Sequence, residues 1–243
     1  MYIYSQAHEL INILFVGFSV AIDERKSVSK RPSVGGYMSR FTDTEREQIY
    51  SQLIEAGQEL FAQFGFERTR ISDLTAEANI GTSTFYQFFD SKEELYFRVL
   101  LVERKNLEQK IAEIVADGET PREEVRLFLK TTLDEVRSNP LISALIVEGE
   151  LRALQDRLEE SGVEKEFVKE QHTDSDLLFT ERWAKAESFR YDDPDLIDQL
   201  IISLVFTVRS QNAPIGSGSE VDYGQVEDAL IETVVDGLFT DNR

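Results

Sequence analysis

The sequence predicts an all-α protein, with a small N-terminal helical unit followed by a larger helical domain. Two observations lead to this fold class. From about residue 44 onward, apolar residues recur at intervals of three and four, which is the period of a helix with one buried face. Helix-start signals precede several of these stretches, whereas no segment shows the alternation of a strand and none repeats another. The prediction is therefore helix packed on helix, without a sheet.

The composition narrows the functional classes. The chain has 243 residues, with 46 acidic against 26 basic side chains, a net charge of −20, two histidines and no cysteine. Without cysteine there are no disulfides, thiolate metal sites or thiol nucleophiles. A hydrolytic enzyme with paired carboxylates stays open as an alternative, but no HExxH motif or glycine-rich phosphate loop supports it. We expect a protein that is not an enzyme and has no cofactor.

The balance of charged residues also suggests an origin. Acidic residues are abundant, and only nine lysines stand against seventeen arginines. Together with the lack of cysteine, this composition favours a cytoplasmic protein of a salt-loving archaeon.

Residues 1–37 differ from the rest, with three acidic and four basic residues. Their apolar run at 10–22 has thirteen residues, whereas a membrane-spanning helix needs roughly twenty. A signal-peptide core or a membrane tether are alternatives, but no Lys or Arg precedes the run. We expect no membrane role and interpret 1–37 as a disordered extension, or as the result of a start assigned too early, with Met38 as the functional start.

The first expected helix opens with a capping box at 44–47 and ends at Gly65. Two short helices are expected next, at 71–78 and 82–89, joined by a turn at 79–81. Another capping box at 91–94 begins a helix that runs to about residue 116. The first helix, which ends at Gly65, should brace the two short ones through an apolar set: Phe61, Phe64, Leu74, Phe85 and Phe89.

The second short helix has two unlike sides. Phe85 and Phe89 lie four residues apart on one side, while small polar residues and Tyr86 lie on the other. Two short helices with a glycine-bearing turn make a helix-turn-helix, whose second helix can enter a DNA major groove. A pair of helices that merely closes a small bundle is the alternative, but such a pair has no need of the polar cluster.

The residues of this region resemble the tetracycline-repressor (TetR) family of transcriptional regulators. The resemblance is strongest at 80–86 and 89–95, where the chain reads IGTSTFY and FDSKEEL, and it extends upstream through 54–61 and 64–66. It covers about a quarter of the chain. It implies an N-terminal helix-turn-helix domain at 38–98 and a helical effector-binding and dimerisation domain at 99–243.

The predicted DNA contacts follow from side-chain chemistry and from the resemblance. Hydroxyl and carboxamide groups suit base edges, so the base-facing candidates are Thr82, Ser83, Thr84 and Gln87. For Ser83 and Thr84, helix capping is the alternative to base contact. The resemblance supports Tyr86 and Lys92 as phosphate contacts, and Arg70 is added because of its charge and its place at a helix start.

The sequence departs from the family pattern at two positions, and both changes remove cationic contacts with DNA. Many family members have lysine in place of Thr82 and histidine in place of Phe88. Between Met38 and Arg98 there are six basic residues against eleven acidic ones, a net of −5. A Debye length of roughly 3 Å near 1 M salt would screen the distant acids.

The rest of the chain is expected to form helices at 121–138, 141–160, 163–188, 194–213 and 222–239. By resemblance this domain holds a pocket for a small-molecule effector, and the weak candidates for its lining are Phe128, Phe179, Trp183 and Arg209. Ordinary core packing, or an interface ion pair for Arg209, is the favoured alternative. A metal site at 172–176 is disfavoured, since a lone histidine among carboxylates is usually solvated.

The last two expected helices, at 194–213 and 222–239, have more apolar surface than one partner can cover, which indicates association. The resemblance implies a homodimer built from these helices, whose two recognition helices read a palindromic double-stranded operator. The predicted function is thus a DNA-binding regulator, most simply a repressor released by an effector. A dimeric helical ligand-binding or interaction protein without DNA binding is the alternative.

Overall fold

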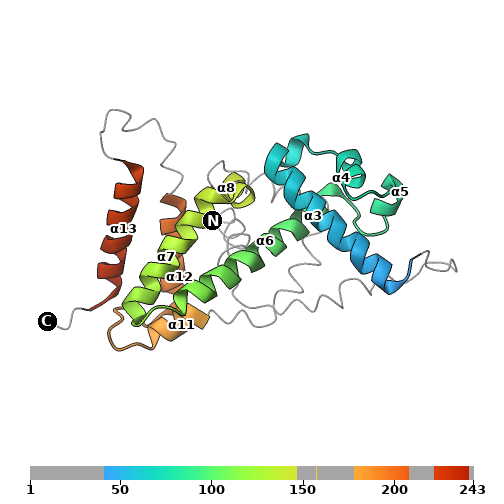
Figure 1. Ribbon diagram of the computed structural model, residues 1–243. Coiled ribbons are helices and arrows are strands. Elements are labelled where there is room, and N and C mark those ends of the chain that lie inside the picture. The colour runs from blue at the N-terminus through green and yellow to red at the C-terminus, as the bar shows by residue number, and fades with distance from the viewer. Residues whose placement is uncertain (1–40, 147–156, 158–177, 208–221, 241–243) are drawn as a thin grey trace.

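The computed structural model describes residues 41–146, 157, 178–207 and 222–240. Within these ranges the regular structure is helical, and only an isolated antiparallel bridge joins Phe189 to Phe239. The all-α prediction is confirmed. Figure 1 shows an elongated molecule in which the N-terminal helices lie at one end and the C-terminal helices at the other, with α6 running between them.

The N-terminal unit has four helices. They are α3 (Asp43–Arg68), α4 (Ile71–Glu77), α5 (Thr82–Phe85) and α6 (Lys92–Val115). The start of α3 was predicted wrongly: its N-cap is Thr42, and Thr42 and Glu45 form the capping box that we placed at 44–47. Gly65 has a φ of +75°, so the helical conformation is interrupted at the predicted glycine although the helix resumes up to Arg68.

The core of this unit contains the predicted residues with one exception. Phe61, Leu74, Phe85 and Phe89 are at most 2% exposed, but Phe64 is 42% exposed. Phe66 takes the inward position instead, because the kink at Gly65 rotates the chain that follows. Its ring lies 5.0 Å from that of Tyr96 on α6, measured between ring centres.

The contact of α3 with α6 is very close at Gly57. A Cβ atom on this glycine would lie 2.7 Å from Cγ2 of Val99, which is shorter than van der Waals contact. The two helix backbones can approach this closely only because Gly57 lacks a side chain.

The C-terminal half begins with α7 (Pro121–Ser138) and α8 (Pro140–Ile146), which are separated at Asn139 as predicted. It continues with α11 (Leu178–Ala184), α12 (Pro194–Thr207) and α13 (Tyr223–Leu238). The Thr120 hydroxyl caps α7 by accepting from the Glu123 N–H, and the Asp222 carboxylate caps α13 by accepting from the Gly224 N–H. The remaining parts of the helices expected at 141–160, 163–188 and 194–213 fall largely outside the described residues.

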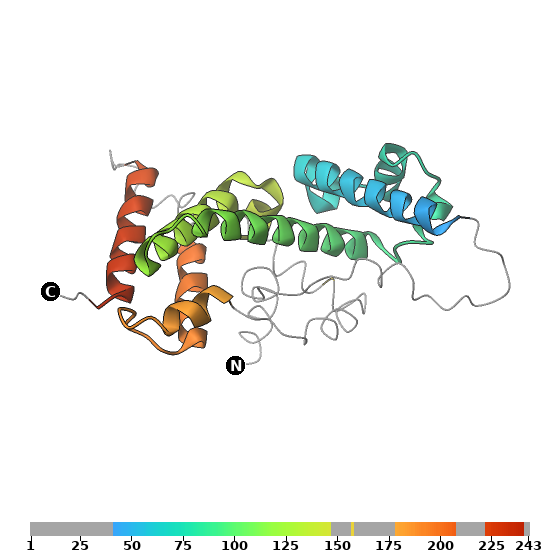
Figure 2. The same cartoon turned by 60° about the horizontal axis from the view of Figure 1, so that its bottom comes forward.

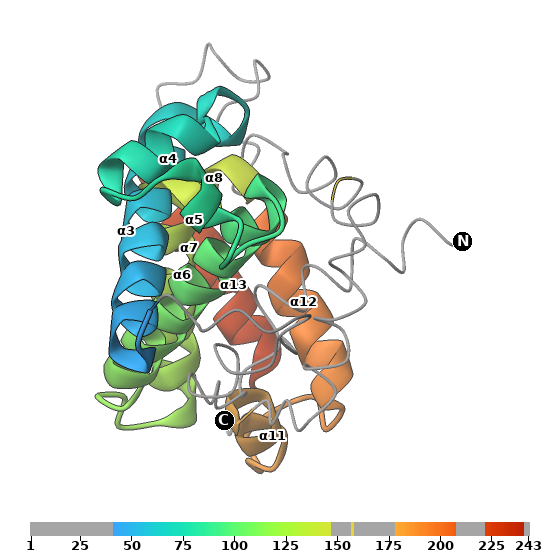
Figure 3. The same cartoon turned by 90° about the vertical axis from the view of Figure 1, so that its right-hand side faces the viewer.

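Helix α7 is the centre of this half, since it packs against α6, α8, α12 and α13. Figures 1 and 2 show α12 and α13 at the end of the molecule far from α5, and Figure 3 looks along the molecule from the α5 end. The boundary predicted near residue 98 falls inside α6, which therefore belongs to both halves.

The apolar run at 10–22 lies outside the described residues. Among the helices that the structure does describe, none combines the length and the apolar character needed to cross a bilayer.

Candidate nucleic-acid interface

The local backbone turns the chain sharply into α5. Asn79 has a φ of +52°, in the left-handed region that asparagine tolerates better than most residues. Gly81 is the N-cap and has no side-chain cap, so neither Ser83 nor Thr84 holds the capping position considered above. The helix itself is shorter than predicted, because after Phe85 the backbone closes i to i+3 bonds, as from the Gln87 N–H to the Thr84 carbonyl at 2.9 Å.

The two sides of this segment differ in burial as predicted. Phe85 and Phe89 are 0% and 1% exposed, whereas Tyr86 is 50% exposed. Gln87 is exposed too, and so are two of the hydroxyl residues, Thr82 and Ser83, with Thr84 half-buried. The Tyr86 ring meets Phe85 edge-on, with 5.4 Å between ring centres. The segment therefore presents hydroxyl and carboxamide groups outward from a base of phenylalanine rings.

Lys92 has internal partners that the sequence did not reveal. Its ammonium donates to the carbonyls of Phe66 at 2.7 Å and of Thr69 at 2.9 Å, and it lies 4.0 Å from the centre of the Phe66 ring. A cation here stabilises the carboxyl end of α3. Desolvation lowers the pKa of this lysine. Only one of the three donor positions of the ammonium remains for a phosphate, so that contact stays a prediction.

Arg70 occupies the exposed N-cap position of α4, where its backbone N–H donates to the Asp73 carboxylate at 3.1 Å. A second arginine, which was not predicted from the sequence, lies near α5. The guanidinium of Arg46 lies 5.0 Å from the centre of the Phe88 ring, although 42 residues separate them. No local motif indicates Arg46, since this contact depends on how α3 crosses the helix-turn-helix.

The start of α6 borders the same surface. The Ser91 hydroxyl accepts from the Glu94 N–H at 3.1 Å, which confirms half of the predicted capping box. In the other half, the Glu94 carboxylate accepts from the N–H of Asp90 at 2.6 Å instead of that of Ser91. This carboxylate is therefore already bound to the backbone of the loop after α5.

The weak candidates for effector binding form one aromatic cluster. Phe128 lies 5.4 Å from Trp183 and 6.1 Å from Phe179, between ring centres, and Phe179 stacks on Trp183 at 5.8 Å. The indole N–H of Trp183 donates to the Glu124 carboxylate at 2.8 Å, and Trp183 is 1% exposed. These rings pack on one another as core residues do. Arg209 lies outside the described residues.

The segment at 172–176, considered as a metal site, also lies outside the described residues. Where the structure describes the chain, no three His, Asp or Glu side chains are grouped so that they could hold a metal ion.

Comparison with known proteins agrees with this geometry. Residues 53–99 match the family model described as "Bacterial regulatory proteins, tetR family". These residues run from the middle of α3 into α6 and include the whole helix-turn-helix. The residues matched by the family model therefore include those that form the exposed polar surface on α5 and the turn after it.

Among curated proteins, an HTH-type transcriptional regulator of Mycobacterium tuberculosis is 29% identical over 98 residues, which are 40% of this chain and 48% of that protein. The chain thus spans about half the length of this relative. The HTH-type transcriptional regulator YhgD of Bacillus subtilis is 25% identical over 171 residues, which are 67% of this chain and 85% of its own.

The fold is also found among solved structures. The structure of RolR in complex with resorcinol aligns with a TM-score of 0.53 and 18% identity, covering 82% of this chain and 92% of RolR. At this identity the likeness extends to the fold alone. It spans both halves of the molecule, which the family model does not.

Proposed function

Since the chain belongs to the TetR family of regulatory proteins, we propose that it is a sequence-specific DNA-binding transcriptional regulator that acts as a homodimer on a palindromic operator. One observation carries the proposal: α5 and the turn after it hold polar side chains outward on a fully buried phenylalanine base. Hydroxyls and carboxamides at such a position can bond to base edges in a major groove.

We assign the base contacts to Thr82, Ser83, Thr84 and Gln87. Glutamine can form two hydrogen bonds with adenine, whereas hydroxyls accept several bases. Gln87 should therefore contribute most of the sequence preference. Tyr86, with half of its surface exposed beside them, is placed for a phosphate contact that fixes orientation without reading sequence.

The cationic contacts are few. Arg70 at the start of α4 and Arg46 beside Phe88 are the arginines that we propose for the DNA backbone, and Lys92 contributes mainly by holding α3 and α6 together. Because the domain carries a net charge of −5, binding should need enough salt to screen the acidic residues. That requirement is opposite to the usual weakening of protein–DNA complexes by salt.

The proposed dimer surface is the outward side of α12 and α13. Leu196 and Leu200 on α12 are 42% and 38% exposed, and Val226 on α13 is 48% exposed. Beside Val226 on α13, Ala229 and Thr233 are exposed and Leu230, Val234 and Gly237 are half-buried, and all five are uncharged. An uncharged strip on a chain of net charge −20 fits contact with its own copy, because the strip itself brings no charged side chains together across the two-fold axis.

A small-molecule effector is the second part of the proposal. RolR, which shares the fold, was solved with resorcinol bound, so a helical domain of this kind can hold a small ligand. For release from DNA, the effector must bind the arrangement that does not fit the operator more tightly than the one that does.

Single substitutions at Tyr86, Gln87 and Lys92 should separate the two kinds of DNA contact. We expect Gln87→Ala to weaken operator binding about tenfold and to relax base preference, since one good base contact contributes about 1–3 kcal/mol. Tyr86→Ala should weaken binding by a similar factor on all DNA sequences, and Lys92→Ala should do so while also lowering stability. Fluorescence anisotropy with the DNA upstream of its own gene, in molar potassium chloride, measures all three.

The matched control is Gln109→Ala, which removes the same side chain from the exposed side of α6 and should leave binding unchanged. Unaltered binding by all three variants, at Tyr86, Gln87 and Lys92, would contradict this interface. No binding by the unsubstituted protein at any salt concentration would favour the alternative, a helical ligand-binding protein without DNA binding.

The dimer surface has a test of its own at Gly237. A Cβ atom here would meet nothing within 4 Å, so Gly237→Leu should fold as a monomer without strain. In the proposed dimer the same side chain would separate the two α13 helices, and we expect conversion to monomer in light scattering coupled to size exclusion. Asn106→Leu on the exposed side of α6 is the control and should stay dimeric. A dimeric Gly237→Leu protein would exclude this face.

A further inference from the structure

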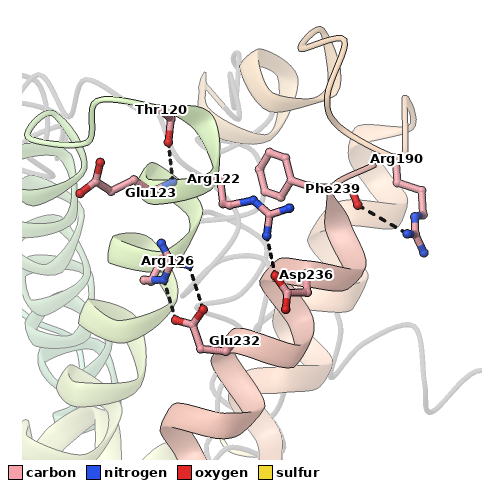
Figure 4. Close-up of polar contacts among 8 residues, drawn as sticks. All are labelled: Thr120, Arg122, Glu123, Arg126, Arg190, Glu232, Asp236 and Phe239. Carbon is pink, nitrogen blue, oxygen red and sulfur yellow. Dashed lines mark hydrogen bonds and ion pairs between the residues drawn. The ribbon is translucent and has the colours of Figure 1, made fainter. Parts of the chain in front are cut away.

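Helix α13 is acidic, and arginines of α7 neutralise most of its carboxylates. Between Tyr223 and Leu238 it has four carboxylates and no basic residue. Three of those carboxylates pair with arginines of α7: Asp236 with Arg122 at 2.5 Å, Glu232 with Arg126 at 2.6 Å and Glu227 with Arg137 at 3.0 Å. Figure 4 shows the first two pairs as successive rungs between the helices. We call Arg122 and Arg126 the arginine row.

The pair at Arg126 has the stronger geometry. Its guanidinium donates from Nε at 2.6 Å and from Nη2 at 2.8 Å to the two carboxylate oxygens of Glu232, which is the bidentate arrangement. This hydrogen bond lowers the pKa of Glu232 and raises that of Arg126, so both stay charged around neutral pH.

Arg122 and the end of α13 are fixed by further contacts. The Arg122 guanidinium also lies 5.0 Å from the centre of the Phe239 ring, which packs edge-on against Phe189 at 4.9 Å. The N–H of Arg190 donates to the Leu238 carbonyl at 2.8 Å. The carboxyl end of α13 is therefore held against the rest of the domain while Arg122 reaches Asp236 (Figure 4).

The carboxylates that pair with the arginine row lie beside the uncharged strip of α13. In the helical period, the buried side of α13 contains Ile231 and Val235, and the outward side contains Ala229 and Thr233. Glu232 falls between the two sides and Asp236 at the edge of the outward side, and their side chains are 50% and 72% exposed. Their carboxylates are bonded toward α7, so their charge is drawn away from the outward face.

We infer that the arginine row neutralises Glu232 and Asp236 beside the outward face of α13. This neutralisation allows the face to pair with a second copy of the chain at low ionic strength. The inference rests on the homodimer of the proposed function. Two-fold symmetry would bring the carboxylates of both copies to one contact. Without the arginines, their repulsion would oppose association until added salt screens it. With the arginines, each pair is neutral and its charge lies on the α7 side.

The test compares the dimer dissociation constant in 0.1 M and 2 M potassium chloride by sedimentation velocity. Arg126→Gln should raise that constant about tenfold or more in 0.1 M salt, because two symmetry-related charges are uncovered in each dimer. In 2 M salt it should match the unsubstituted protein. The double variant Arg126→Gln with Glu232→Gln removes the uncovered charge as well, and should restore association in 0.1 M salt.

Arg182→Gln is the matched control. It breaks an exposed ion pair of similar length, 2.7 Å to Glu124, that does not involve α13, so its dimer should be unchanged. Far-UV circular dichroism at each salt concentration shows whether a variant is folded. If Arg126→Gln is unfolded in 0.1 M salt, the charge swap Arg126→Glu with Glu232→Arg decides: a dimer supports the inference, and a monomer overturns it.

The outcomes separate this inference from the proposed function. If the unsubstituted protein is monomeric in both salts, the homodimer itself is wrong. If it is dimeric and Arg126→Gln has the same dissociation constant in 0.1 M salt, the neutralising role is wrong and the homodimer stands. Suppose that a folded Arg126→Gln variant associates more weakly and that neither 2 M salt nor Glu232→Gln restores association. The inference is then also wrong, because screening by salt and removal of the charge must each restore it.

Discussion

Replacing Phe85 with alanine is expected to lower the free energy of unfolding of the protein by about 3–5 kcal/mol and to abolish DNA binding. The Phe85 ring is fully buried, and its centre lies 5.8 Å from that of Phe89, which in turn stacks on Tyr50 of α3 at 5.4 Å. Removing the ring leaves a cavity between α5 and α3 that a helix of one turn cannot close. Thermal or denaturant unfolding followed by circular dichroism measures the loss.

The neighbouring residue is the control for this prediction. Tyr86→Ala removes a side chain of nearly equal size from the same turn, but this side chain is half exposed. We expect a change in stability of about 0.5 kcal/mol or less, as for most surface substitutions, together with weaker DNA binding. Equal losses of stability from both variants would show that α5 has no distinct inner and outer side.

The second large effect concerns Asp198 of α12, a carboxyl group that is 5% exposed. Burial raises its pKa from 3.8 to about 7, against the opposing effect of a hydrogen bond from Thr180 and with a further increase from Asp195. Because ionisation is disfavoured in the folded state, the contribution of Asp198 to the folding stability should be greatest at about pH 4 and below. It should fall as the pH rises from 4 through 7.

Asp198→Asn should remove this pH dependence. Asparagine keeps an oxygen for Thr180 and has no charge to bury, so at pH 8 the variant should be more stable than the unsubstituted protein. A shift of this size corresponds to about 4 kcal/mol, and partial solvation reduces the expected gain to about 2 kcal/mol. At pH 4 the two proteins should unfold alike.

Melting temperatures measured from pH 4 to 8 at constant potassium chloride would show the effect. Asp228→Asn, on the exposed side of α13, is the control and should follow the unsubstituted protein. A gain for Asp198→Asn that is the same at pH 4 and pH 8 would contradict the role of ionisation.

Local sequence signals were sufficient for the helix boundaries that depend on local chemistry. Thr120 caps α7 and is followed by Pro121, Asp222 caps α13, and Asn139 separates α7 from α8, all as predicted. The two-sided character of the segment after Gly81 was also predictable, because residues four apart in a helix share a side. These features need no knowledge of how the helices pack.

The errors come partly from local backbone geometry and partly from packing between distant segments. The helical period places Phe64 inward, but the φ of +75° at Gly65 moves Phe66 into that position. Lys92 matches a phosphate-binding position in sequence, yet its ammonium reaches carbonyls that are 23 and 26 residues away. Arg46 came into the candidate site for the same reason, through its contact with Phe88. No short motif contains information on such contacts.

The missing side chain at Gly57 has a mechanical consequence for the whole molecule. With its backbone seated against Val99, α3 has little room to slide or roll on α6, so the DNA-binding unit and the first half of α6 should turn together. The 24 residues of α6 extend about 36 Å. A tilt of about 5° applied at the effector-domain end would then move the other end by about 3 Å, a quarter of the width of a major groove. In the proposed homodimer, small rearrangements around α7 would in this way change the spacing of the two α5 helices.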